Sequence, residues 1–494
     1  MKILFVFFGN KRACTPPLGV LTLATILKKN NYDVSVTDSS LFRNNKDLHD
    51  HVLSVQPDVL GLSVISMSYE DADELAEFVK EQIKDCKIVI GGPHATALPT
   101  LVAQNKNIDI VSIGESDVTV LEIMRAIKDG RSNFDDINGI AYRDKDGGEI
   151  VITEKREVVA DLDTIPIPDR SFLPMEKYLS RVPDVPFEFS ATSIMATRGC
   201  YGNCMYCQPL LKKIFGTNIR RRSPALVVEE IEYLLKTYRV KSLWFVDDEP
   251  TWNGEEWMAE ICRLIIDKKI KFTWCAAARV DQISDKLLSD MKKAGCICFM
   301  FGVESGSESI LKIMRKGYRP PKIKEAMDMC RRHKMISRAQ LMVGTPGETT
   351  ETLNETLDMI NEARPDLIGV SITTPTPGSD LYEQFKDSER LQVKSWKDFD
   401  RFVINPIKLE NITPDDLRAT IKNFYRAHFK YHFLTFVNPI LFIKRFYFVK
   451  AIFWHFASQL KSPKTLLSDI GYYLFYSRMR SSAREAAPSE SKSA

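Results

Sequence analysis

The stretch RGCYGNCMYC, residues 198–207, holds three of the ten cysteines in this 494-residue sequence. Thiolates at Cys200, Cys204 and Cys207 can bind three irons of a four-iron, four-sulfur (4Fe-4S) cluster, and a fourth cysteine close by in the sequence is missing. One iron would stay open to a substrate, which favours chemistry at the cluster over simple electron transfer. Two alternatives stay open here, namely a zinc site, which normally uses four ligands, and core cysteines spaced by chance.

A repeated pattern of strands and helices surrounds this stretch. Helical stretches such as 226–237 and 322–333 separate six apolar runs. These runs predict strands at 193–197, 242–246, 273–277, 297–302, 339–343 and 368–372. The pattern predicts a partial (β/α)6 barrel over residues 191–400, with its chemistry at the carboxyl ends of the strands. The cysteines follow the first strand and therefore lie at that end.

The first 135 residues show a second alternation of the same kind. Predicted helices at 18–29, 72–84 and 118–128 alternate with predicted strands at 3–8, 33–36, 59–64, 88–90 and 108–113. This α/β pattern predicts a doubly wound, Rossmann-like sheet whose ligand crevice lies beyond the carboxyl ends of its strands. The loops expected at this crevice contain Pro17, Ser63, Gly91, Gly92, His94, Gly114 and Glu115.

The remaining segments differ in composition. Residues 136–190 are predicted to be a linker, because Pro166 and Pro168 prevent a helix there. Residues 401–480 are helical, aromatic and basic in pattern, and residues 481–494 predict a disordered tail.

The composition argues against several classes of protein. The sequence is 44% hydrophobic, which is ordinary for a globular protein, and its net charge of +3 is too small to indicate a nucleic-acid partner. Neither a secretory signal nor an apolar run of about 20 residues is present, so we expect a cytoplasmic protein. The other cysteines are expected to be buried packing residues. They are Cys14, Cys86, Cys262, Cys275, Cys296, Cys298 and Cys330.

The spacing Cys-x3-Cys-x2-Cys with an aromatic residue before the last cysteine resembles the signature of the radical S-adenosylmethionine (SAM) family. The resemblance implies that the open iron binds SAM and that one electron from the cluster cleaves it to a 5'-deoxyadenosyl radical. It also implies an external one-electron reductant, a flavodoxin or a ferredoxin. The motifs FVDDEPT (245–251), FGVESGSE (301–308) and MVGTPGET (342–349) match the family in the same order.

These motifs supply the residues that the resemblance assigns to SAM binding. They are Tyr206, Asp247, Asp248, Arg279, Glu304, Ser305, Gly344 and Glu348. Simpler roles stay open for several of them. Asp247 or Asp248 could cap a helix, the glycines could mark turns, and Arg279 could form a surface salt bridge as readily as it could bind the SAM carboxylate.

The N-terminal sheet followed by this barrel resembles the cobalamin-binding subgroup of the family, which includes anaerobic porphyrin ring cyclases and class B methyltransferases. The resemblance implies that cobalamin lies between the sheet and the barrel mouth, against the seven crevice residues named above. Many cobalamin domains use Asp-x-His-x-x-Gly, whose histidine binds cobalt. Here Asp47 and His49 match in part, but Val52 replaces the glycine, so we interpret His49 as a surface helix residue and expect cobalamin to be bound without a histidine of this chain.

Two enzymatic functions fit the resemblance. The first is methylation of an unactivated carbon of a hydrophobic small molecule, and the second is oxidative cyclisation or rearrangement without methyl transfer. A non-catalytic iron-sulfur or cobalamin sensor is the alternative from another class. A tRNA methylthiotransferase is rejected, because it needs three more cysteines and only Cys14 and Cys86 precede Cys200.

The C-terminal region has a strong charge bias. Between residues 401 and 480, 13 Lys or Arg face four acids, a difference of +9, and aromatic residues are frequent. Basic residues among aromatic helices are typical of peripheral contact with the inner membrane surface, here through residues 431–476. A helical cap on the barrel is the alternative.

Overall fold

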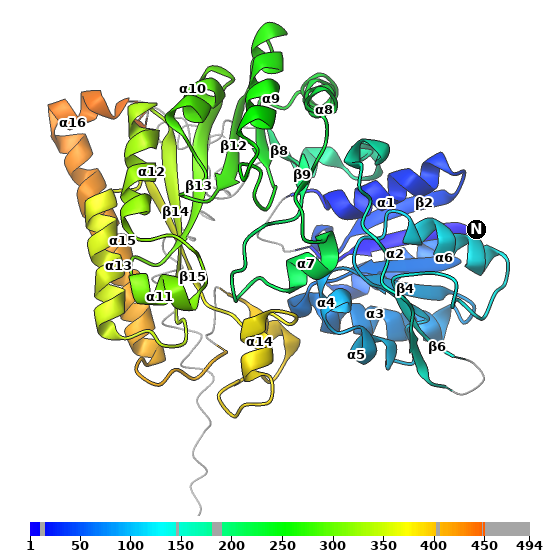
Figure 1. Cartoon of the computed structure of the whole chain (residues 1–494). Helices are drawn as coiled ribbons and strands as arrows, with labels where there is room; N and C mark the ends of the chain where they lie inside the picture. Colours follow the sequence, from blue (N-terminus) through cyan, green and yellow to red (C-terminus); the bar gives the residue numbers. More distant parts are fainter. Residues whose placement is uncertain (10–14, 145–147, 180–189, 402–405, 447, 450–494) are drawn as a thin grey trace, which may run out of the picture.

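The computed structural model describes residues 1–9, 15–144, 148–179, 190–401, 406–446 and 448–449. Two sheets lie side by side, one in each half of the chain, and the short helices α7 (Leu210–Phe215) and α14 (Asp380–Phe385) lie between them (Figure 1). The predicted order of an N-terminal sheet, a barrel and C-terminal helices is confirmed.

The N-terminal sheet has the strand order β2-β1-β3-β4-β5-β6-β7. Its strands are β1 Lys2–Phe7, β2 Asp33–Asp38, β3 Val59–Ser63, β4 Lys87–Gly91, β5 Ile110–Ser112, β6 Ile140–Arg143 and β7 Ile150–Ile152. The helices are α1 Leu18–Lys29, α2 Asn45–Val55, α3 Tyr69–Gln82, α4 Pro93–Ala97, α5 Pro99–Ala103 and α6 Thr119–Lys128. Side chains of β1 alternate between two cores, because Ile3 and Phe5 pack with α1 and α6, whereas Leu4 and Val6 pack with α2 and α3.

This sheet continues past the predicted domain boundary at residue 135. β6 pairs antiparallel with β5, and β7 pairs antiparallel with β6. Ala141 and Tyr142 are buried in the two cores of the N-terminal sheet. The predicted linker at 136–190 is therefore wrong in its first part, which belongs to the N-terminal domain.

The second sheet has six strands, all parallel, in the order β15-β14-β13-β12-β11-β8. They are β8 Ala191–Ile194, β11 Ser242–Phe245, β12 Thr273–Ala278, β13 Cys296–Glu304, β14 Ile336–Val343 and β15 Leu367–Ile372. The helices of this half are α8 Pro224–Tyr238, α9 Glu255–Asp267, α10 Asp285–Lys293, α11 Glu308–Ile313, α12 Pro321–Arg332 and α13 Thr350–Ala363. Side chains such as Phe245, Trp274 and Phe301 join the buried core between strands and helices. The predicted partial barrel is confirmed.

Short elements connect these parts. The two-residue strands β9 (Thr197–Arg198) and β10 (Arg220–Arg221) pair antiparallel and enclose the cysteine stretch between them. The 3-10 turns are η1 Ser39–Leu41, η2 Ser66–Ser68, η3 Leu162–Thr164, η4 Arg170–Phe172, η5 Met175–Lys177 and η6 Trp396–Phe399. Because η6 packs against η2 and α3, the end of the barrel also contacts the N-terminal domain.

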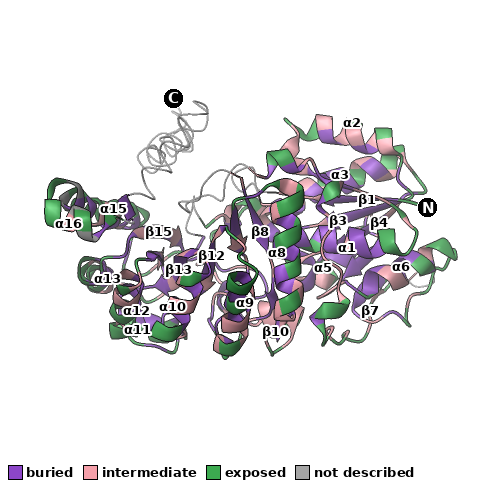
Figure 2. Ribbon diagram, turned by 90° about the horizontal axis from the view of Figure 1, so that it is seen from above, coloured by how far each residue is buried: buried purple, intermediate pink, exposed green. Residues whose placement is uncertain are grey.

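The C-terminal helices α15 (Pro414–Val437) and α16 (Pro439–Lys444) lie on the outside of the barrel, with α15 against α13 and β15 (Figures 1 and 2). Arg445 is only 2% exposed and forms an ion pair with Asp366. It therefore cannot be one of the lipid-facing cations that the charge bias predicted. Most of the predicted membrane segment 431–476, and the whole tail at 481–494, lie outside the described residues. Within the described part of the chain, every helix is too short or too polar to cross a bilayer.

Candidate functional site

The three cysteines lie in one loop between β9 and α7. Gly199 begins this loop with φ +100°, and a Cβ on it would lie 2.8 Å from the carbonyl oxygen of Asn218. A Cβ on Gly202 would lie 3.3 Å from Cys200 Sγ and 3.7 Å from Cys204 Sγ, so two thiols converge on this position. Gly199 permits the close backbone approach to Asn218, and Gly202 keeps the space beside the two thiols clear.

Burial controls the protonation of these thiols. It raises the pKa of Cys200 to about 11, and it raises the pKa of Cys207 still further, with the neighbouring Cys204 adding to the effect. The free thiols of Cys200 and Cys207 therefore stay protonated near neutral pH, and their ligation as thiolates requires a bound positive centre. The described part of the chain contains no set of three His, Cys, Asp or Glu placed to hold a single metal ion. Three soft ligands on one loop fit the 4Fe-4S cluster of the sequence prediction.

A buried triad lies next to the cysteine loop. Glu304 Oε1 accepts hydrogen bonds from Tyr206 Oη at 3.0 Å and from Lys316 Nζ at 3.2 Å. Glu304 has φ +64°, a left-handed conformation that is uncommon for a residue with a side chain and is concentrated at functional sites. Lys316 is 5% exposed, and its charge counteracts the rise in the pKa of the Cys207 thiol. Sequence analysis predicted Tyr206 and Glu304 here but missed Lys316.

Arg279 belongs to the same region but is already engaged. Its guanidinium donates to both carboxylate oxygens of Asp281 at 2.9 Å and to the Lys316 carbonyl oxygen at 2.5 Å. It also lies over the ring of Trp252, which stacks on Tyr201 of the cysteine loop with ring centroids 5.0 Å apart. At 11% side-chain exposure this is not a surface salt bridge, and the guanidinium links the barrel wall to the loop.

Three carboxylates follow β11, and the sequence predicted that two of them, Asp247 and Asp248, bind SAM. In the structure the three have different surroundings. Asp247 Oδ1 accepts from the backbone N–H groups of Ala196 and Thr197, so this side chain supports the entry to the cysteine loop. The side chain of Asp248 reaches solvent, but desolvation by the surrounding protein raises its pKa to about 6. Glu249, which sequence analysis missed, is 2% exposed and accepts from Thr251 Oγ1 at 2.6 Å. Asp248, Glu249 and the Oδ2 atom of Asp247, which has no hydrogen-bond partner among the described residues, remain available to a ligand.

The loops after β13 and β14 differ from each other. Glu348 Oε2 accepts from the backbone N–H groups of Gly344 at 2.6 Å and Thr345 at 3.1 Å, which is the loop-supporting role predicted for it. Gly344 has φ +84°. Ser305, by contrast, is fully buried and bonds to Thr356 Oγ1 at 3.1 Å. The predicted contact of Ser305 with SAM is therefore wrong for its side chain, because that hydroxyl faces a helix.

The predicted cobalamin residues lie at the carboxyl edge of the N-terminal sheet. Pro17 precedes α1, Ser63 ends β3 and Gly91 ends β4. Gly92 follows with φ +100°, and a Cβ on it would lie 2.6 Å from the carbonyl oxygen of Val64. Gly92 thus permits close packing on the backbone of Val64, and these residues stand at the edge where sheets of this kind bind their ligands, which is the position expected for cobalamin. Residues 10–14 of the first loop lie outside the described residues.

His94 is buried beneath the cofactor edge, and its Nε2 atom has no hydrogen-bond partner among the described residues, so its predicted contact with cobalamin stays a prediction. Its side chain is 1% exposed, its Nδ1 lies 3.0 Å from Ser66 Oγ, and its ring packs between Tyr69 and Trp396. Burial lowers the pKa of His94 to about 4, so the ring is neutral. The sequence showed the loop but not that η6 covers it.

Gly114 and Glu115 were predicted to face the open ligand crevice, but both lie against the barrel half of the chain. Glu115 is 6% exposed and pairs with Arg198 and Arg220 of the barrel half. A Cβ on Gly114 would lie 3.6 Å from the Lys213 carbonyl oxygen, because α7 approaches here. His49 is on α2, stacked on Phe78 with ring centroids 4.3 Å apart, as expected for a helix residue away from the crevice.

Family comparisons agree with this division of the chain. The Radical SAM superfamily model matches residues 194–360, and the B12 binding domain model matches residues 6–124. The first match contains all three cysteines, and the second contains the cofactor edge. Each match lies within one half of the fold, and the first ends before β15 and the second before β6.

Relatives match most of the chain. An uncharacterized methyltransferase of Pyrococcus horikoshii is 29% identical over 86% of this chain and 92% of its own length. The anaerobic magnesium-protoporphyrin IX monomethyl ester cyclase of Rubrivivax gelatinosus is 30% identical over 84% of this chain and 74% of its own length. The radical SAM methyltransferase TsrM of Kitasatospora setae, solved with cobalamin and a 4Fe-4S cluster, has the same fold, with 18% identity and a TM-score of 0.68 over 86% of this chain and 91% of its own.

Proposed function

Because the chain belongs to the cobalamin-binding radical SAM family of enzymes, we propose that it transfers a methyl group to an unactivated carbon of a hydrophobic small molecule. Its cofactors are a 4Fe-4S cluster, SAM and cobalamin. When bound, these groups supply the radical and the methyl carrier, and the protein supplies position and exclusion of water.

The observation that carries this proposal is the contact between the cysteine loop and the cofactor edge. α7, which follows Cys207 directly, packs against α4 at that edge. The cluster and cobalamin would therefore lie on facing surfaces of the two sheets. Methyl transfer between two cofactors and a substrate requires that arrangement.

We assign the binding of SAM to side chains around the cysteine loop. Lys316 supplies a buried cation for the SAM carboxylate. Glu304 and Tyr206 hold the ammonium group of Lys316 in place. Asp248 and Glu249 supply acceptors for the SAM amino group, since both lie after β11 near Cys200, whose pKa they help to raise. Gly344 leaves the backbone of its loop open to the adenine.

The alternative reaction is oxidative cyclisation or rearrangement without methyl transfer, which the match to the porphyrin ring cyclase favours. Mass analysis of the product formed with methyl-labelled SAM separates the two. Label in the product supports methyl transfer, and unlabelled product with 5'-deoxyadenosine supports cyclisation. Neither product nor 5'-deoxyadenosine, with reduced flavodoxin or ferredoxin as electron donor, would contradict both and leave a sensor.

A second proposal concerns where the enzyme meets a hydrophobic substrate. Apolar side chains on α15, α16 and the residues after them are exposed, and they are Phe429 69%, Phe433 55%, Val437 57%, Ile440 65%, Ile443 74% and Phe446 57%. Exposed Arg418, Lys422 and Arg426 precede them on α15, and exposed Lys430 follows Phe429. Figure 2 shows exposed surface along α15 and α16. An apolar tip behind a basic segment suits the cytoplasmic surface of an anionic membrane.

A further inference from the structure

Four buried charged side chains connect the N-terminal domain to the strands that enclose the cysteine loop. Arg198 Nη1 lies 2.6 Å from Asp117 Oδ2 and 2.9 Å from Glu115 Oε1, and Arg220 Nη2 lies 2.7 Å from the same Glu115 oxygen. None of the four side chains is more than 8% exposed. Ion pairs this well buried are strongly interdependent, because removing one partner leaves an uncompensated charge.

The position of the two arginines explains why a carboxylate is needed between them. Arg198 and Arg220 are direct partners in the antiparallel β9–β10 pair, and like charges opposite one another destabilise such a pair. Glu115 bonds both guanidinium groups, using both carboxylate oxygens on Arg220. A residue of the N-terminal domain thus neutralises the base of the loop that carries the cysteines.

This base is close to both cofactor sites along the chain. Arg198 stands two residues before Cys200, and Glu115 and Asp117 follow β5 at the carboxyl edge of the N-terminal sheet. Arg220 also donates to the carbonyl oxygens of Val159 at 2.6 Å and Phe215 at 3.0 Å. Val159 lies in the segment between the two domains, so Arg220 contacts that segment as well.

We propose that Glu115 and Asp117 are positioning residues. They act through Arg198 and Arg220 to fix the cysteine loop at one distance from cobalamin. The inference rests on the proposed function, because it takes cobalamin to bind at this edge. Glu115, which the sequence suggested as a cofactor contact, here acts on cofactor geometry without touching the cofactor.

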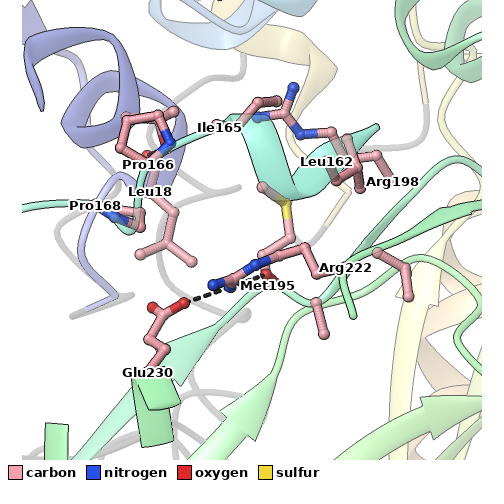
Figure 3. A pocket seen from close by; sticks show the side chains of 12 residues that line it. Leu18, Leu162, Ile165, Pro166, Pro168, Met195, Arg198, Arg222 and Glu230 are labelled. Carbon is pink, nitrogen blue, oxygen red and sulfur yellow. Dashed lines mark hydrogen bonds and ion pairs between the residues drawn. The ribbon is translucent and has the colours of Figure 1, made fainter. Parts of the chain in front are cut away.

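The chain offers a matched control. Glu230 on α8 is also a buried carboxylate, 1% exposed, that is bonded by two arginines, Arg170 and Arg222. Figure 3 shows Glu230 and Arg222 beside a small interdomain cavity of about 30 Å³ that Arg198 also lines. Glu230→Gln therefore removes the same charge from the same kind of network. Arg222 directly follows β10, so the control site adjoins the β9–β10 pair but does not bridge Arg198 and Arg220.

The test uses the full chain reconstituted with cluster and cobalamin, and measures the distance between the reduced cluster and Co(II) by pulsed dipolar EPR. For Glu115→Gln we expect parental contents of both cofactors and parental formation of 5'-deoxyadenosine. The distance distribution should broaden by on the order of 1 Å, a misplacement that slows transfer reactions about 100-fold. Glu230→Gln should leave the distribution unchanged.

Other outcomes overturn the inference. An unchanged distance distribution in Glu115→Gln, or equal broadening in Glu230→Gln, would mean that the ion pairs of Glu115 and Asp117 only stabilise the fold and do not position the cysteine loop. If the Glu115→Gln protein loses its cofactors, Asp117→Asn is measured instead, because that substitution leaves Glu115 bridging the two arginines. An unchanged distance distribution in Asp117→Asn would overturn the inference in the same way. A parent protein that binds no cobalamin would instead defeat the proposed function, before any variant is compared.

Discussion

The ammonium group of Lys316 lies 3.2 Å from the carboxylate of Glu304, and both side chains are at most 10% exposed. The cysteine loop contacts this pair through Tyr206, whose hydroxyl group bonds Glu304. Glu304 is thus the counterion that holds the buried Lys316 cation in place, beside the position proposed for the carboxylate group of SAM.

Lys316→Met should weaken SAM binding by about tenfold or more, because a hydrogen bond to a charged group contributes about 1.5–3 kcal/mol. It should also destabilise the protein by about 3–5 kcal/mol, since Glu304 is left without its partner. Lys316→Arg keeps the charge and should retain most of the affinity. Equilibrium dialysis with SAM on the cluster-loaded protein measures the effect, and equal affinity in Lys316→Met would contradict the assignment.

Substitution of any one of Cys200, Cys204 or Cys207 by Ala should abolish both the 4Fe-4S spectrum and SAM cleavage, because a second iron loses its ligand. Cys298→Ala is the control, since Cys298 is fully buried in β13 and its loss should leave iron content unchanged. Iron and sulfide analysis with an assay for 5'-deoxyadenosine gives the result. A normal cluster in one of the three loop variants would remove that cysteine from the ligand set.

Particular residues show how far the sequence could predict this molecule. The strands were predictable from short apolar runs that are buried, as at residues 59–62 of β3, and the glycines beside the cysteines indicated a local loop. Lys316 and Glu249 were not predictable, because an ordinary lysine and glutamate gain a role only through burial by distant segments. The same reason applies to His94, which is covered by a turn about 300 residues later in the chain.

His49→Ala should leave the visible spectrum of bound cobalamin unchanged. The ring of His49 stacks on Phe78 between α2 and α3, whereas the cofactor edge lies at the carboxyl ends of the strands. The protein used should be the full chain, since the N-terminal sheet extends to Ile152. A spectral shift in the variant would show that a histidine reaches the cobalt after all.

Acid should loosen the C-terminal helices from the barrel. His428 Nε2 lies 2.9 Å from His432 Nε2, with Arg445 beside them, and burial lowers the pKa of His428 to about 4 and that of His432 to about 2. Both rings are neutral in the folded state and gain protons on release. The packing is therefore fully stable above pH 6.5 and weakens as pH falls toward 4, by about 3 kcal/mol for His428 alone.

Hydrogen exchange in α15 at pH 7 and pH 5 measures this loss. His428→Gln should lower protection at pH 7, because the contact with His432 changes, but should reduce the difference between the two pH values. Carboxylates titrate in both proteins, so their contribution cancels in the comparison. An identical pH dependence in the variant would rule out the histidine pair as its source.

The exposed tip of α15 and α16 should bind anionic vesicles. Each basic residue near an anionic surface contributes about 1 kcal/mol, and Lys422, Arg426 and Lys430 lie on the exposed face that leads to the tip. Replacing Phe433 and Ile440 by Ser should reduce flotation with anionic vesicles, and replacing the three basic residues by Gln should make the remaining binding insensitive to salt. Lys322 and Lys324, exposed on α12, provide the control, since their replacement by Gln removes charge elsewhere on the barrel. Arg445 must be left intact, because its pairing with Asp366 holds the helices to the barrel. If the parent protein fails to float with anionic vesicles at low salt, the tip has another role, and the helices serve only as a cap on the barrel.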